Sequence, residues 1–309
     1  MTKPSRRAAR PSPTPSQGRI HPVVIYPFKQ PDDYTDLLAL YRFVAKLDAD
    51  KRRYARPITV MDCKTVAAAQ GDTRFGAFRK HEVAPHSDII EAWCVDTCQM
   101  WYTGLGAAFA RGQENDAYWL IPGDFNYGTQ VGKEVLSRLH DLPEIIEDLD
   151  QDLCIGEIAT DVGHSKHLID DYGTFALLYI WFPELASRIR ELTEQPRSEF
   201  FAIRHGFLHE ALQQRWYAYE QTLVLLLQAV FAGRRISRFS VGEITDLPTG
   251  RDTLDAAIQQ IERTERVLKM CWRSRNLHRG EWVKDYLELK GRSNEVMRSA
   301  FAILSNLLR

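Results

Sequence analysis

The segment Tyr118–Asp124, YWLIPGD, is one of the two stretches on which the predicted fold rests, and the other is the apolar helix expected far downstream, at Leu212–Ala232. Large apolar side chains fill the first half of YWLIPGD, and a Pro-Gly pair followed by an aspartate ends it. A short continuous apolar run bounded by turn residues is typical of a strand buried on both faces of a parallel sheet. We therefore expect a central strand here, with Asp124 at its carboxyl end.

Strands and helices alternate upstream of this segment. Residues Pro22–Pro27, PVVIYP, have the same buried-strand pattern, and a helix is expected to begin at Asp32 and Asp33. Ile58–Met61 is a second short apolar run. The intervening helix is predicted by apolar side chains at helical spacing, namely Leu37, Leu40, Tyr41, Val44 and Leu47. This order predicts a βαβ unit and hence a parallel sheet.

The alternation continues downstream. We expect a helix over Ser87–Arg111, with Ser87 as its cap and Gly112 as its stop. The other expected elements are helices at Lys133–Leu139 and Pro143–Leu149, a strand at Leu153–Ala159, an apolar segment at Leu168–Trp181, a short strand at Phe200–Ile203, an apolar helix at Glu210–Ala232 closed by Gly233, and a strand at Arg235–Ile244. The pattern is helical after Pro248. We predict a disordered basic, Pro-rich arm at residues 1–20, a main α/β domain at 21–247 and a helical extension at 248–309.

The composition of the 309 residues is that of a globular protein, with 44% hydrophobic and 26% charged residues. A net charge of −1 argues against a nucleic-acid partner. Five cysteines without a Cys-x-x-Cys motif favour a reducing compartment, so we expect a cytoplasmic protein. The longest apolar stretches, Phe175–Phe182 and Leu223–Phe231, fall short of the roughly 20 residues of a membrane span.

Four segments of the chain carry a resemblance to a known family: VVIYPFKQPDD, LIPGDF, FFAIRHGF and WYAYEQTLVLLLQAVFAGRRISRFSVGE. Over about residues 22–245 the sequence resembles the GT-A fold, specifically family 2-like glycosyltransferases and the mannosylglycerate synthase type. The resemblance implies a Rossmann-like, mostly parallel sheet flanked by helices, followed by the helical extension. It also implies transfer of a hexose from a UDP- or GDP-type sugar to a small-molecule or lipid acceptor, with Mn²⁺ or Mg²⁺ as cofactor.

The resemblance implies a donor site at the ends of the first two strands. By position, the residues are Tyr26, Pro27, Phe28 and Lys29, followed by Asp62. Tyr26 would stack on the nucleobase, and Asp62 would accept a hydrogen bond from the base or ribose. The alternative is that Tyr26 is a core residue and Asp62 caps a turn.

The metal site departs from the family pattern. The family has Asp-x-Asp after the central strand, whereas this chain has Asp124 alone. Asp124 and His278 are the metal candidates that the resemblance implies, and surface or turn roles are the alternative. Literal Asp-x-Asp patterns occur at Asp48 with Asp50 and within 148–152. Neither follows an apolar strand, so we interpret both as solvated charge clusters.

Three further residues have roles by resemblance. Glu220 would take the proton of the acceptor or orient it, because an inverting transfer needs a carboxylate base. Arg204 lies in the segment expected to line the acceptor pocket. Arg234 would contact a phosphate. The alternatives are a solvated helix residue for Glu220 and a helix-end charge that the dipole favours for Arg234.

Other functions remain possible on the sequence alone. The missing Asp-x-Asp allows a catalytically silent protein that binds a nucleotide sugar or serves as a scaffold. A nucleotidyltransferase is disfavoured because FKQPDD contains no glycine to hold phosphates. The basic arm and the Arg- and Trp-containing C-terminal helices allow peripheral contact with a membrane. The oligomeric state is left open.

Overall fold

The computed structural model describes residues 18–26, 34–63, 66–67, 71–92, 97–159, 165–214, 221–244 and 254–308. Within these residues one seven-stranded sheet has the order β3-β2-β1-β4-β6-β5-β7. All neighbouring strands are parallel except for the pairs that β6 makes with β4 and β5. The strands are β1 Ile20–Tyr26, β2 Ile58–Asp62, β3 Asp88–Ala92, β4 Ala117–Pro122, β5 Leu153–Ile158, β6 Phe201–Arg204 and β7 Ile236–Gly242.

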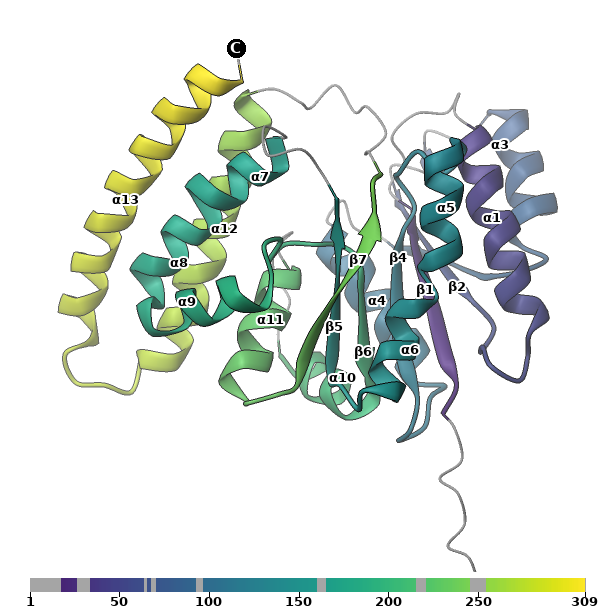
Figure 1. The fold of residues 1–309 in the computed structure, drawn as a ribbon, viewed down its shortest axis with the longest axis horizontal. Helices are drawn as coiled ribbons and strands as arrows, with labels where there is room; N and C mark the ends of the chain where they lie inside the picture. The colour runs from purple at the N-terminus through teal and green to yellow at the C-terminus, as the bar shows by residue number, and fades with distance from the viewer. Residues whose placement is uncertain are drawn as a thin grey trace, which may run out of the picture.

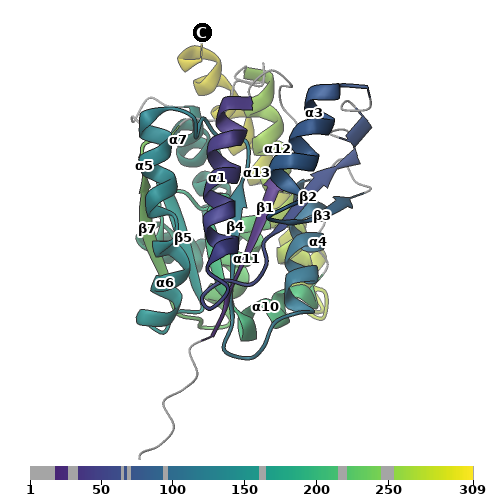
Figure 2. The same cartoon turned by 90° about the vertical axis from the view of Figure 1, so that its right-hand side faces the viewer.

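Helices cover both faces of the sheet (Figures 1 and 2). They are α1 Tyr34–Ala49, α3 Thr73–Phe78, α4 Thr97–Phe109, α5 Gln130–Arg138, α6 Asp141–Asp148, α7 Ser165–Ile169, α8 Ala176–Trp181, α9 Pro183–Leu192, α10 His205–Leu212, α11 Gln221–Phe231, α12 Leu254–Asn276 and α13 Trp282–Leu307, with π-helical turns at Arg79–Val83 and Asp170–Phe175. Alternate strand residues face opposite sides. Val23 and Leu120 lie in the core beneath α4, α8 and α11, whereas Val24 and Trp119 lie in the core beneath α1 and α6.

The structure confirms the predicted α/β class with its mostly parallel sheet and C-terminal helices. Residues 1–17 of the predicted arm lie outside the described residues, and β1 already begins at Ile20. The extension packs through Ile261 and Leu304 into the same apolar core as the sheet. Its predicted boundary near residue 247 stays a prediction, because residues 245–253 are not described. No described helix has the length and apolarity to cross a bilayer.

The predicted helix over Ser87–Arg111 is wrong in its first half. Asp88–Ala92 is strand β3, which pairs in parallel with β2, and α4 spans Thr97–Phe109. Ser87 does not cap a helix, because its buried hydroxyl donates to the carbonyl of Pro57 and bonds the Thr59 hydroxyl at 2.7 Å. The spacing of the apolar residues in this segment fits a helix, but pairing with the edge of β2 makes the segment a strand.

The predicted helix Glu210–Ala232 is likewise two helices. One of them, α10, ends at Leu212, and α11 begins at Gln221. The predicted stop is confirmed, since Gly233 has a φ of 64°, in the left-handed region that glycine adopts without strain.

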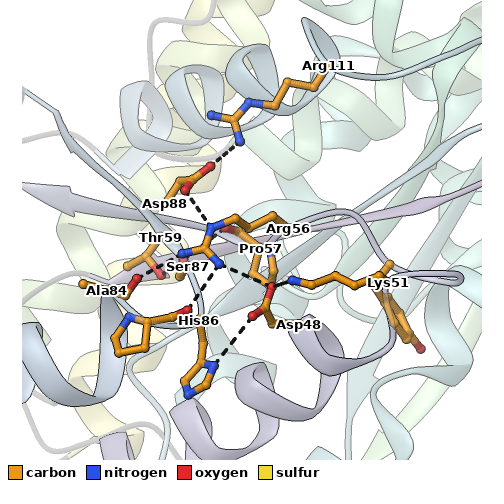
Figure 3. A network of polar contacts seen from close by, with 12 residues as sticks. Asp48, Lys51, Arg56, Pro57, Thr59, Ala84, His86, Ser87, Asp88 and Arg111 are labelled. Carbon is orange, nitrogen blue, oxygen red and sulfur yellow. Dashed lines mark hydrogen bonds and ion pairs between the residues drawn. The ribbon is translucent and has the colours of Figure 1, made fainter.

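A polar network ties together the amino ends of β2 and β3 (Figure 3). The Arg56 guanidinium lies 2.8 Å from Asp88 and 3.5 Å from Asp48, and it donates to two backbone carbonyls. Lys51 pairs with Asp48, and Arg111 pairs with Asp88. Asp48 is only 8% exposed, so its interpretation as a solvated charge is wrong. The first literal Asp-x-Asp pattern is therefore part of a structural network.

Candidate functional site

The chain reverses its winding direction at β1. From β1 the chain crosses to β2 and β3 on one side and then returns to β4 on the other side. In open parallel sheets such a reversal leaves a crevice at the carboxyl ends of the strands, where ligands bind. Residues 27–33, 93–96, 160–164 and 245–253, which follow β1, β3, β5 and β7, lie outside the described residues. The described part of this edge comprises mainly the ends of β2 and β4 and the loop 123–129.

Asp124 lies on that loop directly after β4, at the reversal point. Its side chain is buried, with 4% of the residue exposed. The loop is fixed beside it: the Gly123 N–H donates to the Ile25 carbonyl at 2.7 Å, and the Tyr127 hydroxyl donates to the Pro122 carbonyl at 2.7 Å. The buried ring of Phe125 packs against Phe200, with centroids 4.9 Å apart. The carboxylate is therefore carried by a preorganised loop.

The first turn of α1 holds the far end of this loop. The Asp36 carboxylate, buried at 5% exposure, accepts a hydrogen bond from the Gly128 N–H at 2.5 Å. A methyl group on Gly128 would lie 2.9 Å from Asp36 Oδ1 and 2.9 Å from Thr35 Cγ2. Only glycine lets the backbone approach α1 so closely.

Substitution of Gly128 by alanine should lower the free energy of unfolding by about 1–3 kcal/mol, since overpacking forces the loop away from α1. Urea denaturation measures this change. Gly206→Ala in α10 is the matched control, because no atom lies within 4 Å of the added methyl group and alanine favours a helix. Equal stability of the two variants would contradict a tight Gly128 contact.

Asp62 is the last residue of β2 and is 8% exposed. Because β1 lies between β2 and β4, two strand spacings separate Asp62 from the end of β4, or about 10 Å. The two carboxylates therefore flank the end of β1, which is Tyr26. At that spacing they can contact different parts of one extended ligand.

Arg204 does not lie at the carboxyl edge of the sheet. It ends the antiparallel strand β6 opposite Ala117, the first residue of β4. Its guanidinium donates to the carbonyls of Gln151 at 2.9 Å and Ile146 at 2.6 Å and lies 3.0 Å from Asp150. These contacts tie β6 to the end of α6, at the amino edge of the parallel strands.

Arg234 also lies at the amino edge, just before β7. It pairs with Glu210 and lies over the ring of Phe207.

The neighbouring Arg235 hydrogen-bonds Asp150 and so holds the pKa of that carboxyl below its usual value. Asp152 is buried and accepts the Arg235 N–H at 2.9 Å. The second literal Asp-x-Asp pattern is thus largely structural, and Asp152 is not the solvated charge that we expected.

The remaining predicted residues do not join Asp124 in the described structure. His278 is exposed in the turn between α12 and α13, which Figure 1 shows at the end of the molecule away from the carboxyl ends of the strands. Pro27, Phe28, Lys29 and Glu220 lie outside the described residues, as does the side chain of Tyr26. Within the described residues, one group of three possible metal ligands occurs, His140, Asp141 and Glu144, and it is only half-buried.

The sequence did not identify the residues that support the loop, namely Asp36, Phe125, Tyr127 and Gly128. A recognisable signal was available, because an acidic residue in the first turn of the helix after β1 and a glycine shortly after β4 can meet at the reversal point. Segments that follow two neighbouring parallel strands, here β1 and β4, both begin at the carboxyl edge and can therefore lie side by side.

The order of the strands and the helices on both faces of the sheet give the chain a GT-A-like fold, which solved structures of low sequence identity share. Glucosyl-3-phosphoglycerate synthase from Mycobacterium tuberculosis, crystallised with Mn²⁺, UDP and phosphoglyceric acid, matches with a TM-score of 0.56 at 14% identity, covering 81% of this chain and 78% of that chain. Its complex with Mn²⁺, UDP and glucosyl-3-phosphoglycerate has a TM-score of 0.56 at 15% identity, covering 85% and 86%. No family model and no curated protein matches the sequence. The likeness is therefore one of fold.

Proposed function

We propose that this protein is a glycosyltransferase that moves a sugar from a nucleotide diphosphate, of the UDP type, to a small acceptor. The observation that carries the proposal is the buried Asp124, which lies on a fixed loop at the reversal point of a GT-A sheet. The similar structures support the substrate class, since their crystals hold UDP-glucose with phosphoglyceric acid or glycerol 3-phosphate.

Asp124 and Asp62 would contact different parts of the nucleotide-sugar donor. Asp62 would accept a hydrogen bond from the nucleobase or ribose near Tyr26, and Asp124 would face the diphosphate. The two strand spacings of about 10 Å between β2 and β4 fit an extended nucleotide lying across the end of β1. A buried carboxylate that orients a hydroxyl gives specificity, because an analogue without that hydroxyl leaves the carboxylate unpaired.

A divalent metal fits this arrangement. Carboxylate oxygen is a hard ligand for Mg²⁺ or Mn²⁺, and Mg²⁺ in particular is commonly held by one or two carboxylates together with substrate phosphates. Asp124 would hold the ion, and the ion would supply positive charge for the departing diphosphate. Similar structures contain Mn²⁺ or Mg²⁺ together with UDP. His278 has no place in this proposal, because it lies at the other end of the molecule.

The role of Glu220 and an alternative function of the whole protein stay predictions from the sequence. Glu220 is proposed as the carboxylate that takes or directs the acceptor's proton. A silent nucleotide-sugar binder is the second candidate function. It is favoured by the sequence Gly123-Asp124-Phe125, which offers one carboxylate where the family has two.

Thermal unfolding with UDP, GDP and their sugars, with and without Mn²⁺, tests the proposal. Saturating UDP with Mn²⁺ should raise the Tm by about 4 °C, as expected at roughly 100 times the Kd for a chain of this length. Release of UDP from UDP-glucose in the presence of small phosphorylated or carboxylated acceptors then separates the two candidates. Stabilisation without release supports the silent binder, and no stabilisation by any nucleotide contradicts both.

A further inference from the structure

A cavity of about 680 Å³ lies away from the carboxyl edge of the sheet. It is formed where the ends of α8, α11 and α12 meet the beginnings of α9 and α13. Figure 1 shows these helices on the side of the molecule opposite α1 and α3. No residue that the proposed sugar transfer uses lines the cavity. Its volume is in the range of small-molecule sites, which is about 300–1,000 Å³.

Aromatic side chains form one part of the lining. Trp181, Phe182 and Trp272 are 1%, 3% and 8% exposed, and the two tryptophan rings lie 6.1 Å apart. These rings form the base of the cavity, and the exposed aromatic surface of the lining comes from Tyr179, which is 43% exposed, and the half-buried Phe231. Exposed aromatic surface of this kind takes up the apolar or aromatic body of a ligand.

Three arginines form another part of the lining: Arg275 of α12, Arg279 of the turn between α12 and α13, and Arg292 of α13. None of them forms an ion pair with a carboxylate of the described residues. The Arg275 guanidinium lies 3.5 Å from the centroid of the Phe231 ring, which also lines the cavity. Stacking fixes the plane of the guanidinium and leaves its N–H groups along the edge for a bidentate oxyanion.

Carboxylates also line the cavity, and the helix ends account for the positions of two of them. Glu184 lies in the first turn of α9, and Asp285 lies in the first turn of α13. Acidic residues there are stabilised by the positive end of the helix dipole. Glu288 is the third carboxylate of the lining. Two of the three carboxylates are thus held by helix ends, whereas the three arginines form no ion pair with a carboxylate among the described residues.

We infer that this cavity binds a small organic anion, a carboxylate or phosphate ester with an apolar or aromatic body. The arginines recognise the oxyanion, and the exposed aromatic side chains of the lining take up the body of the ligand. This site is independent of the proposed sugar transfer, because it shares no residue with the carboxyl edge.

Fluorescence titration with anilinonaphthalene sulfonate, an aromatic oxyanion, tests the inference on the full chain. Arg275→Ala and Arg279→Ala should each raise the Kd about ten-fold, since each removes a charge-assisted contact. Arg298→Ala is the matched control, because Arg298 is an exposed arginine of α13 outside the cavity. Its Kd should be unchanged. If Arg275→Ala does not fold, the exposed Arg279 carries the test as Arg279→Gln.

Two further titrations test whether charge is recognised and whether the cavity is separate from the nucleotide site. Neutral phenylnaphthylamine should bind at least about ten-fold more weakly than the sulfonate if the arginines recognise charge. Saturating UDP with Mn²⁺ should leave the titration unchanged. Equal affinity of both probes, displacement of the sulfonate by UDP, or the same Kd in the cavity variants and Arg298→Ala would each overturn the inference.

Discussion

Replacing Asp124 by asparagine should abolish the Mn²⁺-dependent part of UDP binding and lower kcat about 10²–10³-fold. The amide preserves the volume of the side chain on a loop that is fixed on both sides, so the fold should be retained. What is lost is the negative oxygen that would hold a divalent ion against the diphosphate, a contribution of several kcal/mol to the transition state. Calorimetric titration of UDP at several Mn²⁺ concentrations, together with single-turnover kinetics, measures both effects.

Asp141→Asn is the matched control for this experiment. Asp141 belongs to the half-buried group with His140 and Glu144, the other place among the described residues where carboxylates could gather a metal. Its Mn²⁺ dependence should be that of the unmodified protein. Mn²⁺ dependence that survives in Asp124→Asn and disappears in Asp141→Asn would move the metal site to α6.

The strands could be predicted largely because they are buried on both faces. Continuous apolar runs predicted the bounds of β1, β2, β4 and β5 to within two residues at each end. The edge strand β3 was missed since its residues are only partly buried and their spacing also fits a helix. Its extended conformation depends on pairing with β2, which is a tertiary contact without a local signal.

The candidate site was predicted in part for a related reason. Asp62 and Asp124 could be placed because an aspartate after a buried parallel strand must lie at the carboxyl edge. Arg204 could not be placed, because its position depends on the direction of β6. That strand is antiparallel, so its last residue lies at the amino edge. Arg234 precedes β7, which runs parallel to β5 and therefore also begins at the amino edge.

The C-terminal extension is tied to the core by a buried ion pair that was not predicted from the sequence. The Arg197 Nε lies 2.6 Å from Asp170 Oδ1, and the two side chains are 9% and 6% exposed. Arg197 also donates to Gln260 of α12 at 2.8 Å, and the Thr174 hydroxyl donates to Asp170 at 2.9 Å. The pair thus joins the π-helical turn, the segment before β6 and the first helix of the extension.

Arg197→Ala should lower the free energy of unfolding by about 3–5 kcal/mol, because it leaves the Asp170 carboxylate buried without its counter-charge. In a thermal scan the Tm should fall by roughly 5–8 °C. Arg190→Ala is the matched control, since Arg190 pairs with the adjacent Asp171 at 2.8 Å but both side chains are nearly half exposed. Exposed pairs contribute only about 0–1 kcal/mol, so this variant should be close to the unmodified protein.

The double variant Asp170→Leu with Arg197→Met separates the cost of an unpaired charge from the value of the pair. Removing both charges also removes the desolvation penalty, and apolar replacements of buried ion pairs are often neutral or stabilising. The double variant should therefore be more stable than Arg197→Ala alone, although the bond to Gln260 is lost in both. A double variant as unstable as the single one would mean that the contact with α12, rather than the charge on Asp170, holds the extension to the core.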